Sequence, residues 1–238
     1  MIFNKTIEDY LRAVYRVRER DGEVANLALA RELGVTPAAA SEMARRLAEA
    51  DLLRVERYRG VELTAAGERA AVAITRRHRL WEVFLIHTLG FAWDEVHNLA
   101  DELEHIGDER LVDRLEVFLG VPEHDPHGDP IPRRGEKMPP RSDRAVADIA
   151  PGEWATVARV SDEHADLLRY AASLGLRPGA QIAILEQIAF DGSVRLRTEQ
   201  GEAVVSAAVA RSVFVRTTAG VARKSAARNT SAKKKKKG

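Results

Sequence analysis

The chain has 238 residues, 45% of them hydrophobic, which is enough for one to three domains with their own cores. Its 37 Lys and Arg against 36 Asp and Glu leave a formal net charge of +1, and the absence of cysteine excludes disulfides, thiolate metal sites and cysteine nucleophiles. No stretch is apolar enough for a membrane-spanning helix and the first segment becomes charged too soon for a signal peptide, so we expect a cytoplasmic protein.

The first 63 residues predict three helices and a hairpin. Apolar residues at helical spacing predict a helix over 6–20, capped by Thr6 and ended by Asp21-Gly22. A second helix covers 26–33 and stops at Gly34, and a third runs from Thr36-Pro37 to about residue 52. Alternating residues on either side of a turn at 58–60 complete a hairpin. This order is typical of a winged helix-turn-helix.

The third helix of this motif is the predicted DNA-reading element, because its N-terminal residues would enter the major groove. Small residues there permit close approach to base edges, Glu42 could accept from a cytosine amino group, and hydroxyls and arginines could hold phosphates. An ordinary helical domain with solvated arginines is the alternative. The candidate DNA-binding residues are Thr36, Ala38, Ala39, Ser41, Glu42, Arg45, Arg46, Arg57 and Arg59.

Three further helices are predicted over 64–89, 93–106 and 108–119, within a region that is acidic from residue 91 onward. His97, Asp101, Glu104 and His105 stand at i, i+4, i+7 and i+8, so they share one face of their helix. The pair His78 and Glu82 on the preceding helix and the carboxylate of Asp9 on the first helix are further ligand candidates. Imidazole with hard oxygen ligands suits Mn²⁺ or Fe²⁺. The alternative is a solvated acidic helix face.

The rest of the chain changes character twice. Residues 121–140 contain six prolines and predict a linker or ordered loop; a metal site at its His and Asp residues is the less favoured reading. Short alternating runs over 144–216, interrupted by a helix over 163–174, predict a small β barrel. The last 18 residues hold eight basic residues and no acid, and we expect disorder over 218–238.

Taken together, these stretches resemble the diphtheria-toxin-repressor family of metal-dependent transcriptional repressors, including its manganese-transport-regulator branch. The resemblance covers about residues 5–217. It is carried by TIEDYLRAVY, LARELGVTPAAASEMARRL, RYRGVELTAAGE, RHRLWEVFL, EVHNLADELEH and PHGDPIP, while the rear segment with LGLRPG is similar to the SH3-like domain of ferrous-transport accessory proteins.

The resemblance implies a multidomain chain. A mostly α-helical winged helix-turn-helix domain (1–72) precedes an α-helical metal-binding and dimerisation domain with a Pro-rich loop (73–140). A small all-β SH3-like domain (144–217) follows. Beyond the resemblance, composition alone predicts the basic tail (218–238).

The resemblance also implies two metal sites per chain. One falls on Asp9, Asp101, Glu104 and His105, and the other on His78, Glu82 and His97; by the spacing found in iron-type members, the second would add Glu163 and Asp166. The aspartates at 9 and 101 look like the manganese branch. One residue departs from that branch: Arg12 stands where its members have a glutamate that joins a two-metal cluster. Arg12 cannot ligate, which favours separated sites.

We therefore expect a metal-dependent transcriptional regulator of metal-homeostasis genes, a repressor or an activator, in which Mn²⁺ (favoured) or Fe²⁺ orders a homodimer for binding to double-stranded operator DNA. Protonation of His105 would compete with metal, so DNA affinity should fall in acid. A metal-independent winged-helix regulator and a metallo-hydrolase are the alternatives. An enzyme is disfavoured because the sequence has no nucleophile motif and no glycine-rich phosphate loop.

Overall fold

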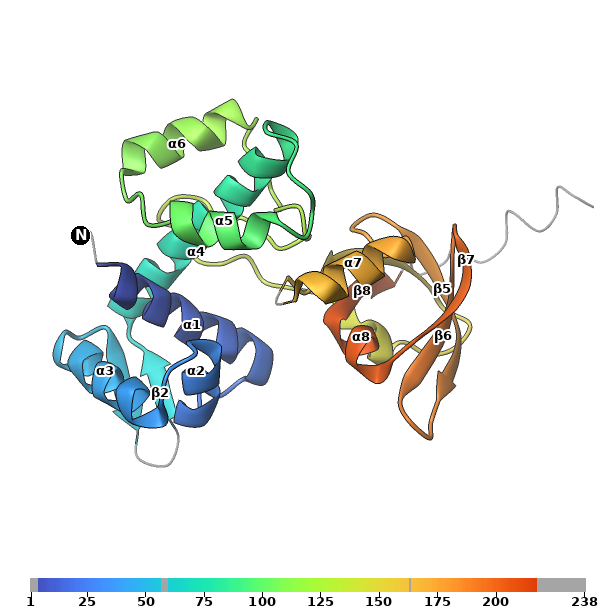
Figure 1. Ribbon diagram of the computed structural model, residues 1–238, viewed down its shortest axis with the longest axis horizontal. Coiled ribbons are helices and arrows are strands. Elements are labelled where there is room, and N and C mark those ends of the chain that lie inside the picture. Colours follow the sequence, from blue (N-terminus) through green and yellow to red (C-terminus); the bar gives the residue numbers. More distant parts are fainter. Residues whose placement is uncertain (1–3, 57–59, 163, 218–238) are drawn as a thin grey trace, which may run out of the picture. The chain divides into compact units, whose positions relative to one another are not determined.

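The computed structural model describes residues 4–56, 60–162 and 164–217 (Figure 1). They divide into two compact units, one ending at Pro140 and the other beginning at Arg141. Within these described ranges, no helix has the length and apolarity needed to cross a membrane. The predicted basic tail and the wing residues Arg57 and Arg59 lie outside the described residues.

The first unit opens with α1 (Lys5–Asp21), α2 (Asn26–Glu32) and α3 (Pro37–Glu49), followed by the antiparallel hairpin of β1 (Leu53–Glu56) and β2 (Gly60–Leu63). The side chain of Asn4 accepts a hydrogen bond from the amide of Ile7, so Asn4 caps α1 and the prediction of Thr6 as its cap was wrong. The predicted cap of α3 is confirmed, because the Thr36 side chain accepts from the amide of Ala39.

The hairpin packs closely on the helices, and this contact depends on one glycine. A Cβ at Gly60 would lie 2.0 Å from the carbonyl oxygen of Val24, and Gly60 also has a positive φ of 92°. The next residue, Val61, donates its amide to that same carbonyl at 3.1 Å. Only glycine permits this approach. The wing is thereby joined to the segment between α1 and α2, over a core that includes Leu11, Val14 and Leu29.

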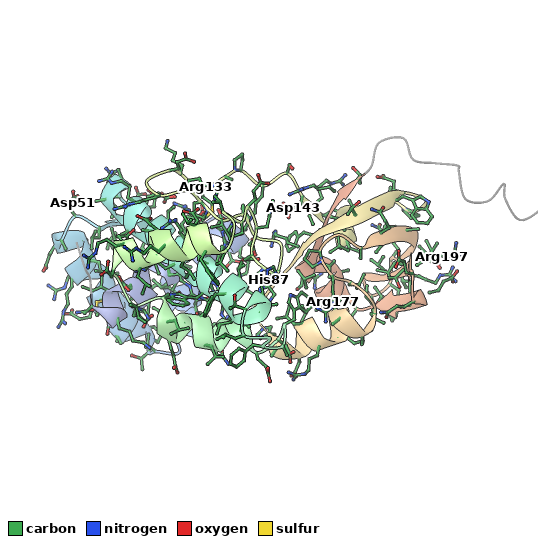
Figure 2. All side chains as sticks on the ribbon, turned by 90° about the horizontal axis from the view of Figure 1, so that it is seen from above. Asp51, His87, Arg133, Asp143, Arg177 and Arg197 are labelled. Carbon is green, nitrogen blue, oxygen red and sulfur yellow. The ribbon has the colours of Figure 1, made fainter. Side chains whose placement is uncertain are left out.

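Helix α4 (Ala65–His87) leaves the winged helix and continues without a break into the rest of the unit (Figure 1). Its N-terminal half packs on α1, and its later half packs on α5 (Val96–Leu103) and α6 (Glu109–Phe118). Because α5 ends at Leu103, Glu104 caps its C-terminus and His105 lies beyond it. The last residue of α4, His87, is labelled in Figure 2 and has an exposed side chain.

The second unit is a six-stranded antiparallel sheet in the order β3-β8-β4-β5-β6-β7. The alternating strands predicted over 144–216 and the helix predicted over 163–174 are present. The short β3, the 3₁₀ turn η1 and α8 were not predicted. The elements are β3 (Arg144–Ala145), η1 (Val146–Asp148), β4 (Trp154–Val160), α7 (Ala165–Ser173), β5 (Gln181–Ile188), β6 (Ser193–Thr198), β7 (Gly201–Val205), α8 (Ala207–Ser212) and β8 (Val213–Thr217).

Candidate metal centres and DNA-binding helix

The first candidate centre joins α1 to the end of α5. Ligand atoms of Asp9, Glu104 and His105 all lie within 4.8 Å of one another. Nε2 of His105 is 3.0 Å from Oδ1 of Asp9 and 4.0 Å from Oε1 of Glu104. Ligand atoms on one ion lie at most about twice a metal–ligand distance apart, or roughly 4 Å. The three side chains are therefore close enough to share a divalent ion.

The buried carboxylate of Glu8 fixes the imidazole of this centre. Oε2 of Glu8 lies 2.9 Å from Nδ1 of His105, and Oε1 accepts from Arg77 at 2.7 Å. A carboxylate on one ring nitrogen holds the proton there and leaves the other nitrogen, Nε2, to face the ligands. The sequence analysis missed Glu8. Its only signal is its position beside Asp9 on α1.

The second candidate centre consists of His78, Glu82 and His97, from α4 and α5. Oε1 of Glu82 lies 3.1 Å from Nε2 of His78 and 3.4 Å from Nδ1 of His97. His78 and Glu82 come from successive turns of α4, as their i, i+4 spacing requires. Both are buried.

A third group, Glu82, Asp125 and His127, is fully buried and extends from the second centre into the Pro-rich loop. Nε2 of His127 lies 3.0 Å from the carbonyl oxygen of Trp93, an acceptor, so Nε2 carries the proton and Nδ1 faces Oε1 of Glu82 at 3.7 Å. The amides of His127 and Asp129 donate to Oδ1 of Asp125 and set the loop's shape. These loop residues received little weight in the sequence analysis, because nothing in a Pro-rich segment indicates which side chains turn inward.

Between the first two centres lie His78, Asp101 and Glu104, again with ligand atoms within 4.8 Å of one another. The guanidinium of Arg12, from α1, contacts all three. Its Nη2 is 2.6 Å from Oδ1 of Asp101, and its Nη1 lies 3.1 Å from Nδ1 of His78 and also donates to Glu104. The structure thus places Asp101 beside Arg12 and His78 instead of with Asp9 and His105.

Burial and neighbouring charges shift the pKa values in these groups. Burial opposes ionisation of Glu82, but the neighbouring His78, His127 and His97 hold the pKa of Glu82 well below its usual range. Burial and Arg12 disfavour the charged form of His78, yet Glu82, Asp101 and Glu104 raise its pKa well above the ordinary value. Burial raises the pKa of Asp9. Burial, then Asp129 and Glu82, raise the pKa of Asp125 to about 7.

Two carboxylate oxygens support metal binding independently of spacing. Oε2 of Glu82 and Oε1 of Glu104 are buried and accept no hydrogen bond from any residue that the structure describes. A buried carboxylate oxygen without a donor is costly, and a cation is the partner that would offset that cost. Each of these oxygens belongs to one of the first two centres, so the residues present fit divalent ions there.

The two predicted ligands from the second unit stay predictions. Glu163 lies outside the described residues. Asp166 is in the first turn of α7, its side chain is 93% exposed, and it pairs with Arg169 on the same helix.

All seven predicted DNA-binding residues of α3 and its cap (36, 38, 39, 41, 42, 45 and 46) are exposed, while Ala40, Ala44 and Leu47 face the core. Glu42 accepts from Arg45 at 2.9 Å and from Arg46 at 3.2 Å. These ion pairs restrain both arginines on the helix surface.

Three family models match successive parts of this chain. The model of the iron-dependent repressor N-terminal DNA-binding domain matches residues 3–61, and that of the iron-dependent repressor metal-binding and dimerisation domain matches residues 64–133. The FeoA domain model matches residues 144–217. The first two cover more than half of the chain, so the chain is a DNA-binding, metal-dependent regulator by class. It belongs to the iron-dependent repressor family.

Relatives and solved structures agree with this assignment. The chain is 32% identical to the iron-dependent repressor IdeR of Mycobacterium tuberculosis over 75% of its length and 83% of the relative's. It is 30% identical to the diphtheria toxin repressor of Corynebacterium jeikeium, over 88% and 96%. A manganese-dependent transcriptional repressor in complex with manganese has a TM-score of 0.84 and 36% identity, covering 89% of this chain and all of that one. These proteins are repressors and not enzymes, which disfavours the metallo-hydrolase alternative.

Proposed function

We propose that this chain is a manganese- or iron-activated repressor in which divalent ions fasten the winged helix to the helical region that follows it. Asp9, Glu104 and His105 hold one ion, and His78, Glu82 and His97 hold the other. A bound ion supplies positive charge that cancels carboxylate repulsion. The observation that carries the proposal is that the first centre takes Asp9 from α1 and its other ligands from the end of α5.

This geometry couples metal binding to the position of the DNA-reading helix. α1 packs against α2 and α4, so fixing Asp9 restrains the winged helix. Binding of metal and of DNA then favour each other by about 1–3 kcal/mol, a typical coupling free energy. The donor set of carboxylates and imidazoles, without sulfur, favours Mn²⁺ over softer-ligand metals.

The proposed DNA contacts are those of α3 and the wing. Thr36, Ser41, Arg45 and Arg46 would hold phosphates, while Ala38, Ala39 and Glu42 would face base edges. Arg57 and Arg59, in the wing, would add phosphate contacts. The proposed place of action is the cytoplasm, where operator DNA and reduced metal ions are both accessible.

We further propose a homodimer formed by the apolar surface of α5 and of the α4–α5 connection. Leu99 and Leu103 are only partly buried against the small core of Leu85, Val96 and Ala100, and Ile106 is 44% exposed. Leu89 and Phe91 in the connection are also exposed. Exposed apolar residues gathered on neighbouring segments of a chain of this class favour a second copy as their partner.

The test is an anaerobic DNA-binding titration. The chain is mixed with a pool of random duplexes, and bound sequences are selected with Mn²⁺, with Fe²⁺ and with a chelator. The proposal predicts enrichment of a palindromic sequence only with metal, with half-sites about one helical turn apart.

The variant Asp9→Asn should lose metal-activated binding and keep its fold, while Asp21→Asn, at the far end of α1, serves as the matched control. Sequence-specific binding that persists in chelator would contradict the proposal.

A further inference from the structure

Arg12 carries its charge at a place that a metal ion would otherwise suit. The three side chains around its guanidinium are themselves a candidate metal group, and the ligand-type atoms facing it are Nδ1 of His78, Oδ1 of Asp101 and Oε2 of Glu104. Nδ1 of His78 lies 2.9 Å from Oε2 of Glu104 and 3.2 Å from Oδ1 of Asp101.

The inference drawn from this arrangement rests on the proposed function of the two flanking metal centres. We propose that the guanidinium of Arg12 is a built-in cation that occupies the third position between them, so that the chain binds separate ions and not a bridged pair.

The neighbouring residues divide their atoms between Arg12 and the flanking centres. Glu104 directs Oε2 to the guanidinium and Oε1 toward His105. His78 directs Nδ1 to the guanidinium and Nε2 to Glu82. Each flanking centre therefore shares one residue with the position that Arg12 fills, and an ion in place of Arg12 would be bridged to both neighbours.

The guanidinium is well suited to hold this position. Arg12 is only 7% exposed, and Glu104 is fully buried, so neither charge is screened by water. An arginine does not lose its proton at any ordinary pH, and here the guanidinium forms ion pairs with two carboxylates at once. An entering ion would have to displace the guanidinium from its carboxylate partners. A guanidinium that stayed buried without those partners would be costly.

Arg12 reaches this position because of its place on α1. It follows Glu8 by four residues and Asp9 by three, so all three side chains lie on one face of the helix. α1 thus presents a ligand (Asp9), the carboxylate that orients His105 (Glu8) and a fixed cation to the same cluster. The Arg12 contacts also connect α1 to α5 before any metal binds.

The test counts ions. Full-length wild type, Arg12→Gln and Arg12→Lys are saturated anaerobically with Mn²⁺, freed of excess ion and assayed for manganese per chain. Electron paramagnetic resonance then asks whether any ions are exchange-coupled. We expect separate, uncoupled ions in the wild type and in Arg12→Lys. Arg12→Gln should bind one additional ion per chain and show a coupled pair.

Two further variants locate the additional ion. Arg18→Gln makes the same substitution on α1 where the arginine pairs with Glu68, and it should leave the count unchanged. Asp101→Asn combined with Arg12→Gln removes one charge of each sign and should abolish the gain. An unchanged count in a folded Arg12→Gln would overturn the proposal. A coupled pair in the wild type would overturn it too, and this second measurement does not depend on any variant folding.

These outcomes separate Arg12 from the proposed function. A wild type that binds Mn²⁺ and DNA together, with no gain in Arg12→Gln, contradicts only the role of Arg12. A wild type that binds no Mn²⁺ contradicts the proposed function, and an ion gained by Arg12→Gln would still support the built-in cation.

Discussion

The imidazole of His105 is held by Glu8 at Nδ1, and this makes Glu8 important to the first centre although it is not a ligand. Glu8 contacts Nδ1 while Nε2 faces Asp9. Partners of this kind fix the ring's proton and its orientation. Arg77 donates to the other oxygen of Glu8 and holds that carboxylate in place.

Glu8→Gln should lower Mn²⁺ affinity at the first centre by about 10- to 100-fold, the usual effect of losing such a partner. Calorimetric titration of metal into the apo chain measures it. Glu68→Gln, which alters an ion-paired carboxylate away from the centres, should leave affinity unchanged. Equal affinities for Glu8→Gln and wild type would show that His105 is oriented without Glu8.

Asp125 makes the metal-free chain sensitive to pH. Its pKa is raised to about 7 in the fold, by burial first and then by Asp129 and Glu82. The folded chain therefore binds this proton more tightly than the unfolded chain does, so Asp125 favours folding in acid. That contribution is lost as pH rises from about 4 toward 7.

Asp125→Asn cannot ionise and should flatten this dependence. In chelator, the fall in Tm between pH 5 and pH 8 should be smaller in the variant by about 2–4 °C for each kcal/mol of Asp125 ionisation cost removed. Asp113→Asn changes a partly exposed carboxylate that is paired with Arg134 and should keep the wild-type slope. Identical slopes in Asp125→Asn and wild type would show that this carboxyl titrates normally.

At the scale of elements, α3 has a charge arrangement that opposes tight unspecific binding. Glu42 holds Arg45 and Arg46, so each arginine must exchange an internal partner for a phosphate when DNA binds. The exposed residues of α3 therefore carry less available positive charge than a count of arginines suggests.

Glu42→Gln should raise affinity for random-sequence duplex a few-fold at low salt and steepen its salt dependence by up to about two phosphate contacts. Fluorescence anisotropy across a series of KCl concentrations measures both. Glu49→Gln, which alters a longer contact to Arg45 at 3.4 Å, should have a smaller effect. If Glu42→Gln binds random duplex no better than Glu49→Gln, the pairs to Glu42 do not restrain the arginines.

Some helices and strands could be predicted from the sequence better than others. Strongly periodic helices and alternating strands were predicted, because burial of one face leaves a regular pattern. The end of α5 was not: a helical phase was assumed through His105, whereas the helix stops at Leu103. The four candidate ligands were still identified, because Glu104 and His105 follow directly after the last residue of the helix. Asp125 and His127 were undervalued because a loop has no period, and only the folded chain shows that they turn toward Glu82.

At the scale of the whole chain, the three family matches cover the DNA-binding, metal-binding and FeoA regions in order. The division at 72 and 73 remains a prediction, since α4 runs through it as one helix. Exposed apolar residues occur both near α5 and on α6, where Val117 is 71% exposed. The proposed dimer uses the former.

Ile106→Glu should weaken the dimer at least tenfold, because it would bury a charge in an apolar interface. Sedimentation velocity at micromolar concentrations measures the shift toward monomer. Val117→Glu on α6 is the matched control and should sediment as wild type. If Val117→Glu weakened the dimer and Ile106→Glu did not, the interface would lie on α6.

The unbroken course of α4 has a mechanical consequence. With 23 residues at about 1.5 Å each, the helix is a rod of roughly 34 Å. Its first turn lies against the wing's hairpin, and its later turns carry His78 and Glu82. Rotating such a rod by about 6° at one end displaces the other by roughly 3.5 Å, close to the rise of one base pair. A tilt of α4 set by an ion at His78 and Glu82 would therefore be amplified at the end of the helix that meets the wing.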